Sequence, residues 1–254
     1  MKIVVPVKQV PNLVDDLEVN DAGTGLDEDS LTFVINEFDE HALEQAVLLK
    51  EAGSGSVTAI GVDTTEELEG VLHLALARGA DSVARIPHDF EPGLSSHTQA
   101  QMLSKAIGEL GADLILTGVQ AADDRDGNLG PMIAAHLGWP YVGVVAGIKV
   151  NGAVATVHKE YPGGVMAEFE VELPAVVGIQ AAAQPPRYAP ISKIRQMAKE
   201  ASIQEVTVEA EAGAGSQVRR MYLPESTSHA EMLGSNAGEV AQKILNLLSE
   251  RGLL

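Results

Sequence analysis

Cysteine is absent from this sequence of 254 residues, and its absence excludes disulfides, thiolate catalysis and cysteine-ligated metal or iron–sulfur sites. Aromatic residues make up only 4% of the chain, so the stacking platforms that bind single-stranded nucleic acid are scarce. No apolar run approaches the roughly 20 residues needed to cross a bilayer. The N-terminus, MKIVVPV, reads directly as an apolar strand without a cleavable leader, so we expect a cytoplasmic protein.

Basic residues are also few. The chain has 17 Lys and Arg against 36 Asp and Glu, which gives a formal net charge of −19. A surface of this sign repels nucleic acid and anionic lipid, and it can steer a basic partner. Hydrophobic residues nevertheless make up 45% of the chain, which is ample for a globular core. The length suits one large α/β domain with a docking extension.

The motifs of common catalytic and nucleotide-binding sites are missing as well. The chain contains no GxGxxG, GxxxxGK[ST], GxSxG or HExxH pattern. Asp124, Asp126 and Asn128 have the spacing of a calcium loop, but Leu129 stands where that loop requires glycine and no glutamate closes it. We therefore expect no catalytic residue and no metal site, so that any chemistry must come from a cofactor.

Apolar strand-like segments alternate with amphipathic helical segments up to about residue 147. Capping pairs at Thr64–Glu67 and Ser96–Gln99 mark two helix starts, and Gly79 and Gly111 mark two helix ends. This alternation predicts a doubly wound, mostly parallel sheet covered by helices on both faces. The expected strands are residues 2–7, 56–62, 82–86, 113–117 and 141–146, and the expected helices are residues 38–52, 68–79, 96–111 and 131–137.

Turn signals after residue 147 predict antiparallel hairpins at one edge of the sheet. Asn151-Gly152 tolerates the positive φ angles of a two-residue turn, and Pro162-Gly163-Gly164 marks a second turn. From residue 184 to about 235 the periodicity is weak and Pro, Gly and Ser recur, as in a loop or linker.

The C-terminus reads as a separate arm. Asn236 and Glu239 cap a last amphipathic helix with Val240, Ile244 and Leu247 on one face. Such a tail does not close a core by itself, so we expect it to pack on a partner. The expected organisation is an α/β domain over residues 1–183, a docking loop and linker over 184–235, and a C-terminal helix over 236–254.

Ligands of open α/β sheets bind beyond the carboxyl ends of the strands. The loop that begins at Gly118 is the most unusual of those expected there, and it leads to Pro131, a residue that suits the first turn of a helix. The backbone N–H groups around Asn128 to Gly130 would then be unpaired and could bind an anion.

The acidic residues of this loop leave alternatives open. Asp123, Asp124 and Asp126 would repel a bare phosphate, and they could instead cap backbone groups or hold a ribose. Glycine-bounded loops that only cap a helix are also common. The loop alone therefore does not decide between a phosphate site and an ordinary helix start.

Several motifs, taken together and in order over residues 1 to about 200, resemble the β subunit of electron-transfer flavoproteins. The segments that carry the resemblance are VKQVP (7–11), INEFDE (35–40), ALARGAD (75–81), QAADD (120–124) running to LGWP (137–140), LPAVV (173–177) and PRY (186–188). The resemblance implies an adenine-nucleotide α-hydrolase-like fold. It also implies a non-enzymatic electron carrier, heterodimeric with an α subunit that holds FAD and served by a flavin dehydrogenase.

The resemblance further implies that this chain binds AMP as a structural nucleotide. By position, the nucleotide-binding residues would be Pro6, Asn36, Glu37, Phe38, Asp39, Val62, Gly118, Val119, Gln120, Ala121, Ala122, Asp123, Asp124, Arg125, Asp126, Gly127, Asn128 and Leu129. Phe38 would lie toward the flavin of the partner, and Glu160 would face the mobile flavin domain. Ile191, Ile194 and Met197 would dock the dehydrogenase.

Each assignment has an alternative from the residues themselves. Asn36 could cap the helix that begins near Phe38, Phe38 could be a core residue, and Glu160 could simply be solvated. Asp126 to Leu129 replaces polar residues that many relatives carry, which favours backbone contacts to phosphate. Residues 189–197 thin the family's basic cluster, so the dehydrogenase partner need not be a typical acyl-CoA dehydrogenase.

Two other functions remain open at this point. The chain could be a bifurcating relative that binds a second FAD, reduced by NADH, in place of AMP. It could also be a stand-alone adenine-nucleotide sensor or hydrolase on a similar sheet, although no SGGxDS phosphate loop is present.

Overall fold

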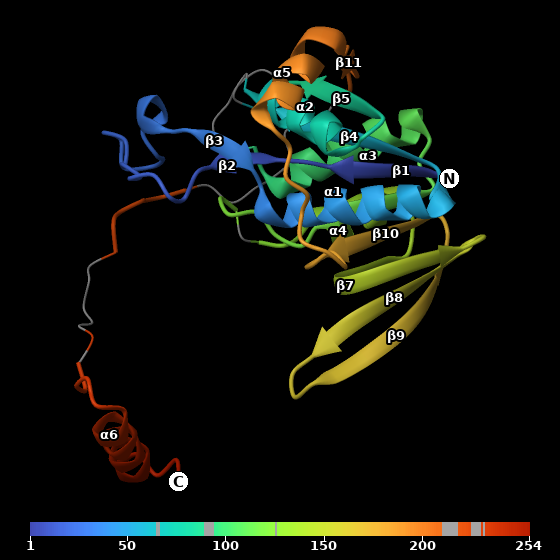
Figure 1. Cartoon of the computed structure of the whole chain (residues 1–254). Helices are drawn as coiled ribbons and strands as arrows, with labels where there is room; N and C mark the ends of the chain where they lie inside the picture. Colours follow the sequence, from blue (N-terminus) through green and yellow to red (C-terminus); the bar gives the residue numbers. More distant parts are fainter. Residues whose placement is uncertain (65–66, 89–93, 125, 210–217, 225–229, 231) are drawn as a thin grey trace.

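A computed structural model describes residues 1–64, 67–88, 94–124, 126–209, 218–224, 230 and 232–254 of the chain (Figure 1). Its centre is a nine-stranded sheet in the order β11-β5-β4-β1-β6-β10-β7-β8-β9. The strands from β11 to β7 run parallel, and β8 and β9 continue the sheet antiparallel. The parallel strands are β1 (Lys2–Pro6), β4 (Ser56–Asp63), β5 (Ser82–Pro87), β6 (Leu114–Gly118), β7 (Tyr141–Asn151), β10 (Ala175–Ile179) and β11 (Gln204–Glu205).

Two apolar clusters cover the two faces of the sheet, as the alternation of strands and helices predicts. Leu43 of α1 (Glu37–Leu49) and Leu72 of α2 (Leu68–Arg78) belong to one cluster. Ile107 of α3 (Ser96–Leu110) and Ile133 of α4 (Leu129–Leu137) belong to the other. Because the parallel strands are buried on both sides, they read as continuous apolar runs such as LILT in β6. The prediction of a doubly wound α/β fold is confirmed.

The antiparallel edge is also present where the turn signals placed it. β8 (Val154–Tyr161) pairs with β7 across Asn151-Gly152, and β9 (Val165–Glu172) pairs with β8 across Gly163-Gly164. Val144 of β7 has a φ of 63°, and the register shifts between Val145 and Gly147. The resulting bulge lies where β7 exchanges its partner β10 for β8.

The helix ends follow the sequence signals only in part. Gly79 and Gly111 end α2 and α3 in left-handed conformations, and the Asn236 side chain caps α6 (Ala237–Glu250), as predicted. The capping pair Thr64–Glu67 is wrong, because Glu67 itself stands at the cap of α2 and no side chain bonds there. The cap of α3 is Ser95, whose hydroxyl accepts the Thr98 N–H, rather than Ser96.

Several elements lie where the periodicity predicted none. A two-stranded ribbon of β2 (Gln9–Pro11) and β3 (Phe33–Ile35) follows β1 and leads into a projection with a short 3-10 helix, Glu28–Ser30. The weak pattern after residue 184 hides α5 (Ile191–Glu200), which packs against α2. A π-helical turn, Lys50–Ser54, extends α1 and overlaps the end of the helix expected over residues 38–52.

The C-terminal helix α6 contains no buried residue and lies apart from the sheet in Figure 1. Its apolar side chains Ile244, Leu245 and Leu247 are exposed. Among the described residues, no helix is long and apolar enough to span a membrane.

Candidate functional site

The carboxyl ends of β1 and β6 form a topological switch point. From β1 the chain moves outward through β4 and β5, and it then returns to β6 on the opposite side of β1. The loops that leave β1 and β6 therefore diverge, and a crevice that suits a ligand opens between them in folds of this kind. The side chains described next meet at this point of the sheet, at the end of β1 that leads into β2 and β3 in Figure 1.

Asp39, in the first turn of α1, accepts hydrogen bonds from both the loop after β1 and the end of β6. Its Oδ2 accepts the Lys8 backbone N–H at 2.9 Å, and its Oδ1 accepts the Gly118 backbone N–H at 3.2 Å. Asp39 is buried, and this burial raises the pKa of its carboxyl to about 7, although hydrogen bonds from Lys8, Asn36 and Gly118 act in the opposite direction.

Asn36 makes a second connection to the loop after β6. Its Nδ2 donates to the carbonyl of Gln120 at 2.9 Å, and its backbone N–H donates to the carbonyl of Lys8. Asn36 does stand at the N-cap of α1, but its side chain makes no capping bond there. The interpretation of the Asn36 side chain as a simple helix cap is therefore wrong.

Lys8 completes the connection with its side chain. Its Nζ lies 2.8 Å from Asp123 Oδ1 and 3.0 Å from Asp124 Oδ2. Burial alone would lower the pKa of this ammonium, but the attraction of the two carboxylates outweighs burial and raises it. We call Lys8, Asn36, Asp39, Gly118, Gln120, Asp123 and Asp124 the switch-point cluster.

Asp126, the third carboxylate of the loop, also has hydrogen-bond partners. Its Oδ2 accepts the Ser96 hydroxyl at 2.7 Å, and its Oδ1 accepts the Asn128 backbone N–H at 2.9 Å. The expectation that the Asn128 N–H would be unpaired is therefore wrong, because its own loop caps it. The same bonds join the start of α3 to the loop that precedes α4.

Glycine is required where β6 meets α1. A Cβ on Gly118 would lie 2.3 Å from Asp39 Oδ1 and 2.9 Å from Phe38. A Cβ on Gly130 would lie 2.7 Å from the Thr117 Oγ1, a buried hydroxyl without a partner among the described residues. The start of α4 therefore packs directly on the end of β6.

The structure places the predicted nucleotide-site residues along this edge of the sheet. Phe38 is half-buried beside Gly118 and belongs to neither apolar cluster, so it is not a core residue. Arg125 lies outside the described residues. Of the others, Pro6, Asn36, Asp39 and Ala121 are buried, Val62, Gly118, Val119, Gln120, Ala122, Gly127 and Leu129 are half-buried, and Glu37, Asp123, Asp124, Asp126 and Asn128 are exposed.

Sequence reasoning missed Lys8 as a member of the site. Its ammonium meets carboxylates that follow it by more than 100 residues, and no local spacing encodes such a pair. The available signal was its position, because Lys8 follows the first buried strand directly and so stands at a carboxyl end.

The segment that leads to α5 is held against α1 by charge. The Arg187 guanidinium binds both carboxylate oxygens of Glu44 and also Glu51, and these bonds hold the pKa of Arg187 above its ordinary range. The Ala183 N–H donates to Gln45 Oε1 on the same helix. These contacts with α1 thus fix the segment from which α5 begins.

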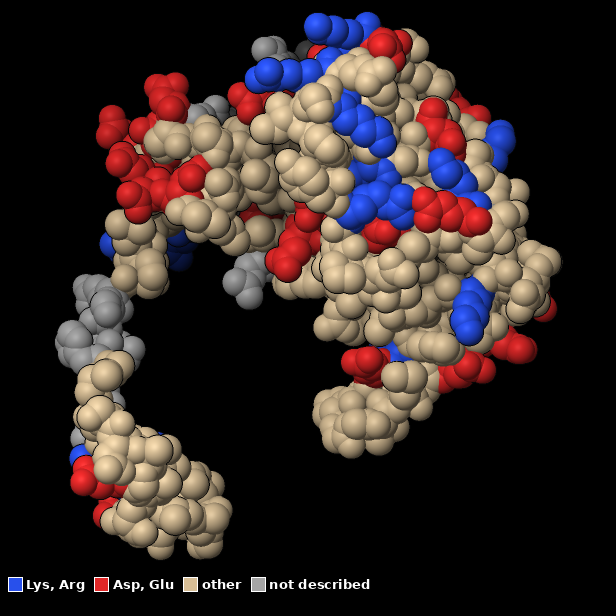
Figure 2. Space-filling model, in the orientation of Figure 1, with Lys and Arg blue, Asp and Glu red and all other residues tan. Residues whose placement is uncertain are grey.

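The predicted docking residues lie on α5, away from the switch-point cluster. Ile191 is 63% exposed, and Ile194 and Met197 are half-buried. Figure 2 shows Lys and Arg over α5, which contains Lys193, Arg195 and Lys199, and Asp and Glu over the projection between β2 and β3. Glu160 is exposed near the end of β8, opposite Met166 of β9.

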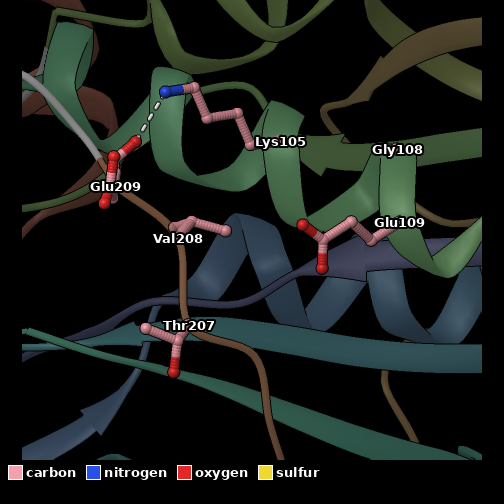
Figure 3. A pocket seen from close by; sticks show the side chains of 6 residues that line it. All are labelled: Lys105, Gly108, Glu109, Thr207, Val208 and Glu209. Carbon is pink, nitrogen blue, oxygen red and sulfur yellow. Dashed lines mark hydrogen bonds between the residues drawn. The ribbon is translucent and has the colours of Figure 1, made fainter.

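A shallow depression lies elsewhere, between α3 and the segment after β11 (Figure 3). Its lining is Lys105, Gly108, Glu109, Thr207, Val208 and Glu209, and the Lys105 ammonium donates to the Glu209 carbonyl. Lys105 follows Ser96 by nine residues on one helix, a separation of about 13 Å at 1.5 Å per residue, so the depression is remote from the switch-point cluster.

Among the described residues, no group of three acidic or histidine side chains could hold a metal ion.

Comparison with known proteins supports one assignment. A family model described as the electron transfer flavoprotein domain matches residues 24–211. The electron transfer flavoprotein subunit beta of Methylophilus methylotrophus is 33% identical over 98% of this chain and 98% of its own length. The subunit of the same name from Bradyrhizobium diazoefficiens is 31% identical, with 100% of both chains covered. The acryloyl-CoA reductase electron transfer subunit gamma of Anaerotignum propionicum is 36% identical over 77% of this chain and 74% of its own length.

Proposed function

The chain belongs to the electron transfer flavoprotein family as a β subunit, and from this membership we propose that it is the AMP-binding half of a heterodimeric electron carrier. The observation that carries the proposal is the switch-point cluster, where Lys8, Asn36 and Asp39 bind the loop after β6. In this proposal residues 1–183 form the nucleotide-binding domain.

The residues at the switch point fit an adenine nucleotide. The three aspartates that would repel a phosphate already have partners in Lys8, Ser96 and the Asn128 N–H. The glycine at position 118 lets the loop approach α1 closely. Asn36 to Asp39 and the loop from Gly118 to Leu129 would hold AMP, which serves as a structural ligand and supplies no chemistry. Because phosphate-binding side chains are few there, backbone N–H groups carry most of that contact.

Electron transfer in this proposal occurs at an FAD held mainly by an α subunit. That flavin supplies the redox chemistry when bound, and the residues of this chain make and break no bonds. Phe38 lies half-buried at the start of α1, where a partner's flavin could contact its ring. Glu160 is exposed on β8, which suits a carboxylate that faces a moving partner domain.

Two surfaces would serve the partners. Residues 236–254 would pack on the α subunit, because α6 has an apolar face and no buried residue. Residues 184–235 would include the dehydrogenase-docking element, with Ile191, Ile194 and Met197 as apolar contacts on α5. The exposed basic residues of α5 favour an acidic surface on that dehydrogenase.

A bifurcating subunit is the second candidate. One relative is named as an electron transfer subunit of acryloyl-CoA reductase, which suggests delivery of electrons to a reductase rather than only receipt from a dehydrogenase. In that case a second FAD, reduced by NADH, would occupy the switch point in place of AMP. A stand-alone sensor is less compatible with the exposed apolar face of α6.

Co-expression with the neighbouring α-like subunit tests the proposal. We expect one flavin in the visible spectrum of the purified heterodimer and AMP in its acid extract. Two flavins per heterodimer, with reduction by NADH, would replace the AMP assignment by the bifurcating one. A chain that binds neither the α subunit nor an adenine nucleotide would contradict both.

A further inference from the structure

Lys8 pairs with two carboxylates of the loop that forms part of the proposed nucleotide site, and we propose that it determines which ligand charge the site accepts. By binding Asp123 and Asp124, Lys8 offsets part of the negative charge of the loop after β6 and allows it to take an anionic adenine nucleotide. This inference rests on the proposed function, because it concerns the same ligand.

The loop is unfavourable for an anion without this lysine. Asp123, Asp124 and Asp126 lie within four residues of one another, in a chain whose net charge is −19. Asp126 is held by neutral donors, the Ser96 hydroxyl and the Asn128 N–H, so its charge is bound but not cancelled. Like charges at short range disfavour a second anion, and they do so most strongly in partly buried positions.

Hydrogen bonds of the Lys8 backbone hold this residue in place, and with it the base of the side chain that carries the ammonium. Its N–H donates to Asp39 and its carbonyl accepts the Asn36 N–H, so both sides of the residue are bonded to the start of α1. Its side chain is only 18% exposed and reaches both carboxylates with bonds of 2.8 and 3.0 Å. A charge held in this way needs no rearrangement when a ligand arrives.

Among the described residues, the ion pairs of this ammonium are with Asp123 and Asp124, although its charge also acts to lower the pKa of Asp39. The two oxygens of Asp39 accept backbone N–H groups, one from Lys8 and one from Gly118. Within the described part of the chain, Asp123 and Asp124 form ion pairs with Lys8 alone. Among the described residues, the ion pairing of these two carboxylates therefore depends on this side chain.

Lys8 could instead act only as a mechanical link between the two loops. Variants that remove charged groups separate the two roles. Lys8→Met keeps most of the length of the side chain and removes its charge. The triple variant Lys8→Met, Asp123→Asn, Asp124→Asn removes the link together with both carboxylates, so these three positions no longer repel an anion. Lys8→Arg keeps the charge and serves as the conservative control.

The test is equilibrium binding of adenosine, AMP and ADP to the full-length chain freed of nucleotide, with circular dichroism as a check of folding. For Lys8→Met we expect AMP to bind roughly tenfold more weakly and ADP more weakly still, because the repulsion grows with ligand charge. Adenosine should change by no more than about twofold, and the AMP deficit should shrink with added salt. The triple variant should return AMP affinity to within about threefold of the native value.

Any one of four results would overturn the assignment. If adenosine loses as much affinity as AMP, or if the triple variant binds AMP no better than Lys8→Met, Lys8 is only a link. Should Lys8→Met fail to fold, Asp123→Asn, Asp124→Asn with native Lys8 must bind ADP more tightly than the native chain does. If the native chain binds no adenine nucleotide at all, the proposed function fails, and this inference fails with it.

Discussion

The carboxylate of Asp39 and the backbone of Gly118 lie so close that residue 118 has no room for a side chain. Asp39 Oδ1 accepts the Gly118 N–H at 3.2 Å, and a Cβ on residue 118 would approach the same oxygen to 2.3 Å. Helix α1 and strand β6 are 79 residues apart in sequence at these positions. Because residue 118 is a glycine, α1 and β6, the two elements that frame the proposed site, can lie this close together.

Gly118→Ala should destabilise the protein and distort the switch-point cluster. The added methyl would collide with Asp39 and with the Phe38 backbone, and overpacking of this kind costs about 1–3 kcal/mol. Gly108→Ala is the matched control, because that position in α3 has no neighbouring atom within 4 Å and alanine favours a helix. Urea unfolding should show a lower midpoint for the first variant and an equal or higher one for the second. Equal midpoints for native and Gly118→Ala protein would contradict the collision.

Asp39 should make stability depend on pH. Its folded-state pKa is about 7 against an ordinary value of 3.8, so the folded protein binds a proton that the unfolded chain releases. Its contribution to the unfolding free energy is therefore greatest below about pH 4 and declines as pH rises to about 7, by at most about 1.4 kcal/mol per pH unit.

The isosteric variant Asp39→Asn has no such proton. The unfolding free energy of the native protein minus that of Asp39→Asn should fall between pH 4 and 7 and stay level above pH 8. Denaturant titrations at four or five pH values measure the difference, and the subtraction removes the other titrating groups. A difference that is flat over the whole range would show that Asp39 is ionised throughout.

Arg187 should anchor the segment before α5. In Arg187→Met the carboxylate of Glu44, which is buried, loses its cation, and we expect a loss of about 1–3 kcal/mol after allowance for the partial exposure of the arginine. Glu51→Gln is the control, because Glu51 is exposed and its removal leaves the Glu44 pair intact. Limited proteolysis should cleave residues 181–200 faster in Arg187→Met only. Equal cleavage rates in the two variants would assign the anchoring to other contacts, such as Gln45 with Ala183.

Ile191→Ser should weaken docking of the dehydrogenase without affecting the fold. The side chain is 63% exposed, so its loss leaves no cavity and the unfolding free energy should stay within about 0.5 kcal/mol. Apolar anchors at interfaces contribute most of the affinity, so the apparent KM for the carrier should rise about tenfold or more at little change in kcat. Ser192→Ala, on the same turn, should change neither. A kcat defect with unchanged KM would place Ile191 outside the docking surface.

The sequence patterns identified the layers of this fold because buried parallel strands leave a strong local signal. β6 reads as LILT, and the amphipathic helices α2 and α3 end at Gly79 and Gly111. Short elements were missed. β2 and β3 have three residues each, and α5 is a short helix after a proline-rich stretch, with an apolar face (Ile191, Ile194 and Met197) that is not buried in the core.

The switch-point cluster was predictable by position and not by interaction. Family resemblance placed Asn36, Asp39 and the loop after β6 together, but it did not indicate what their side chains do. Asn36 looked like a cap and instead binds the Gln120 carbonyl. Lys8 was overlooked because its partners, Asp123 and Asp124, are brought to it only by the parallel pairing of β1 with β6. Interactions of this range depend on topology, which local spacing does not encode.

The sheet ends at β9, whose outer backbone groups meet no further strand within the described residues (Figure 1). Val165 and Phe169 stand exposed on one face of this edge, and alternate positions on the other face carry glutamates such as Glu168 and Glu170. An open edge with an apolar face is a template for self-association, and the carboxylates counter it by repelling an identical edge. Screening or protonation of these carboxylates should therefore favour edge-to-edge association of this chain.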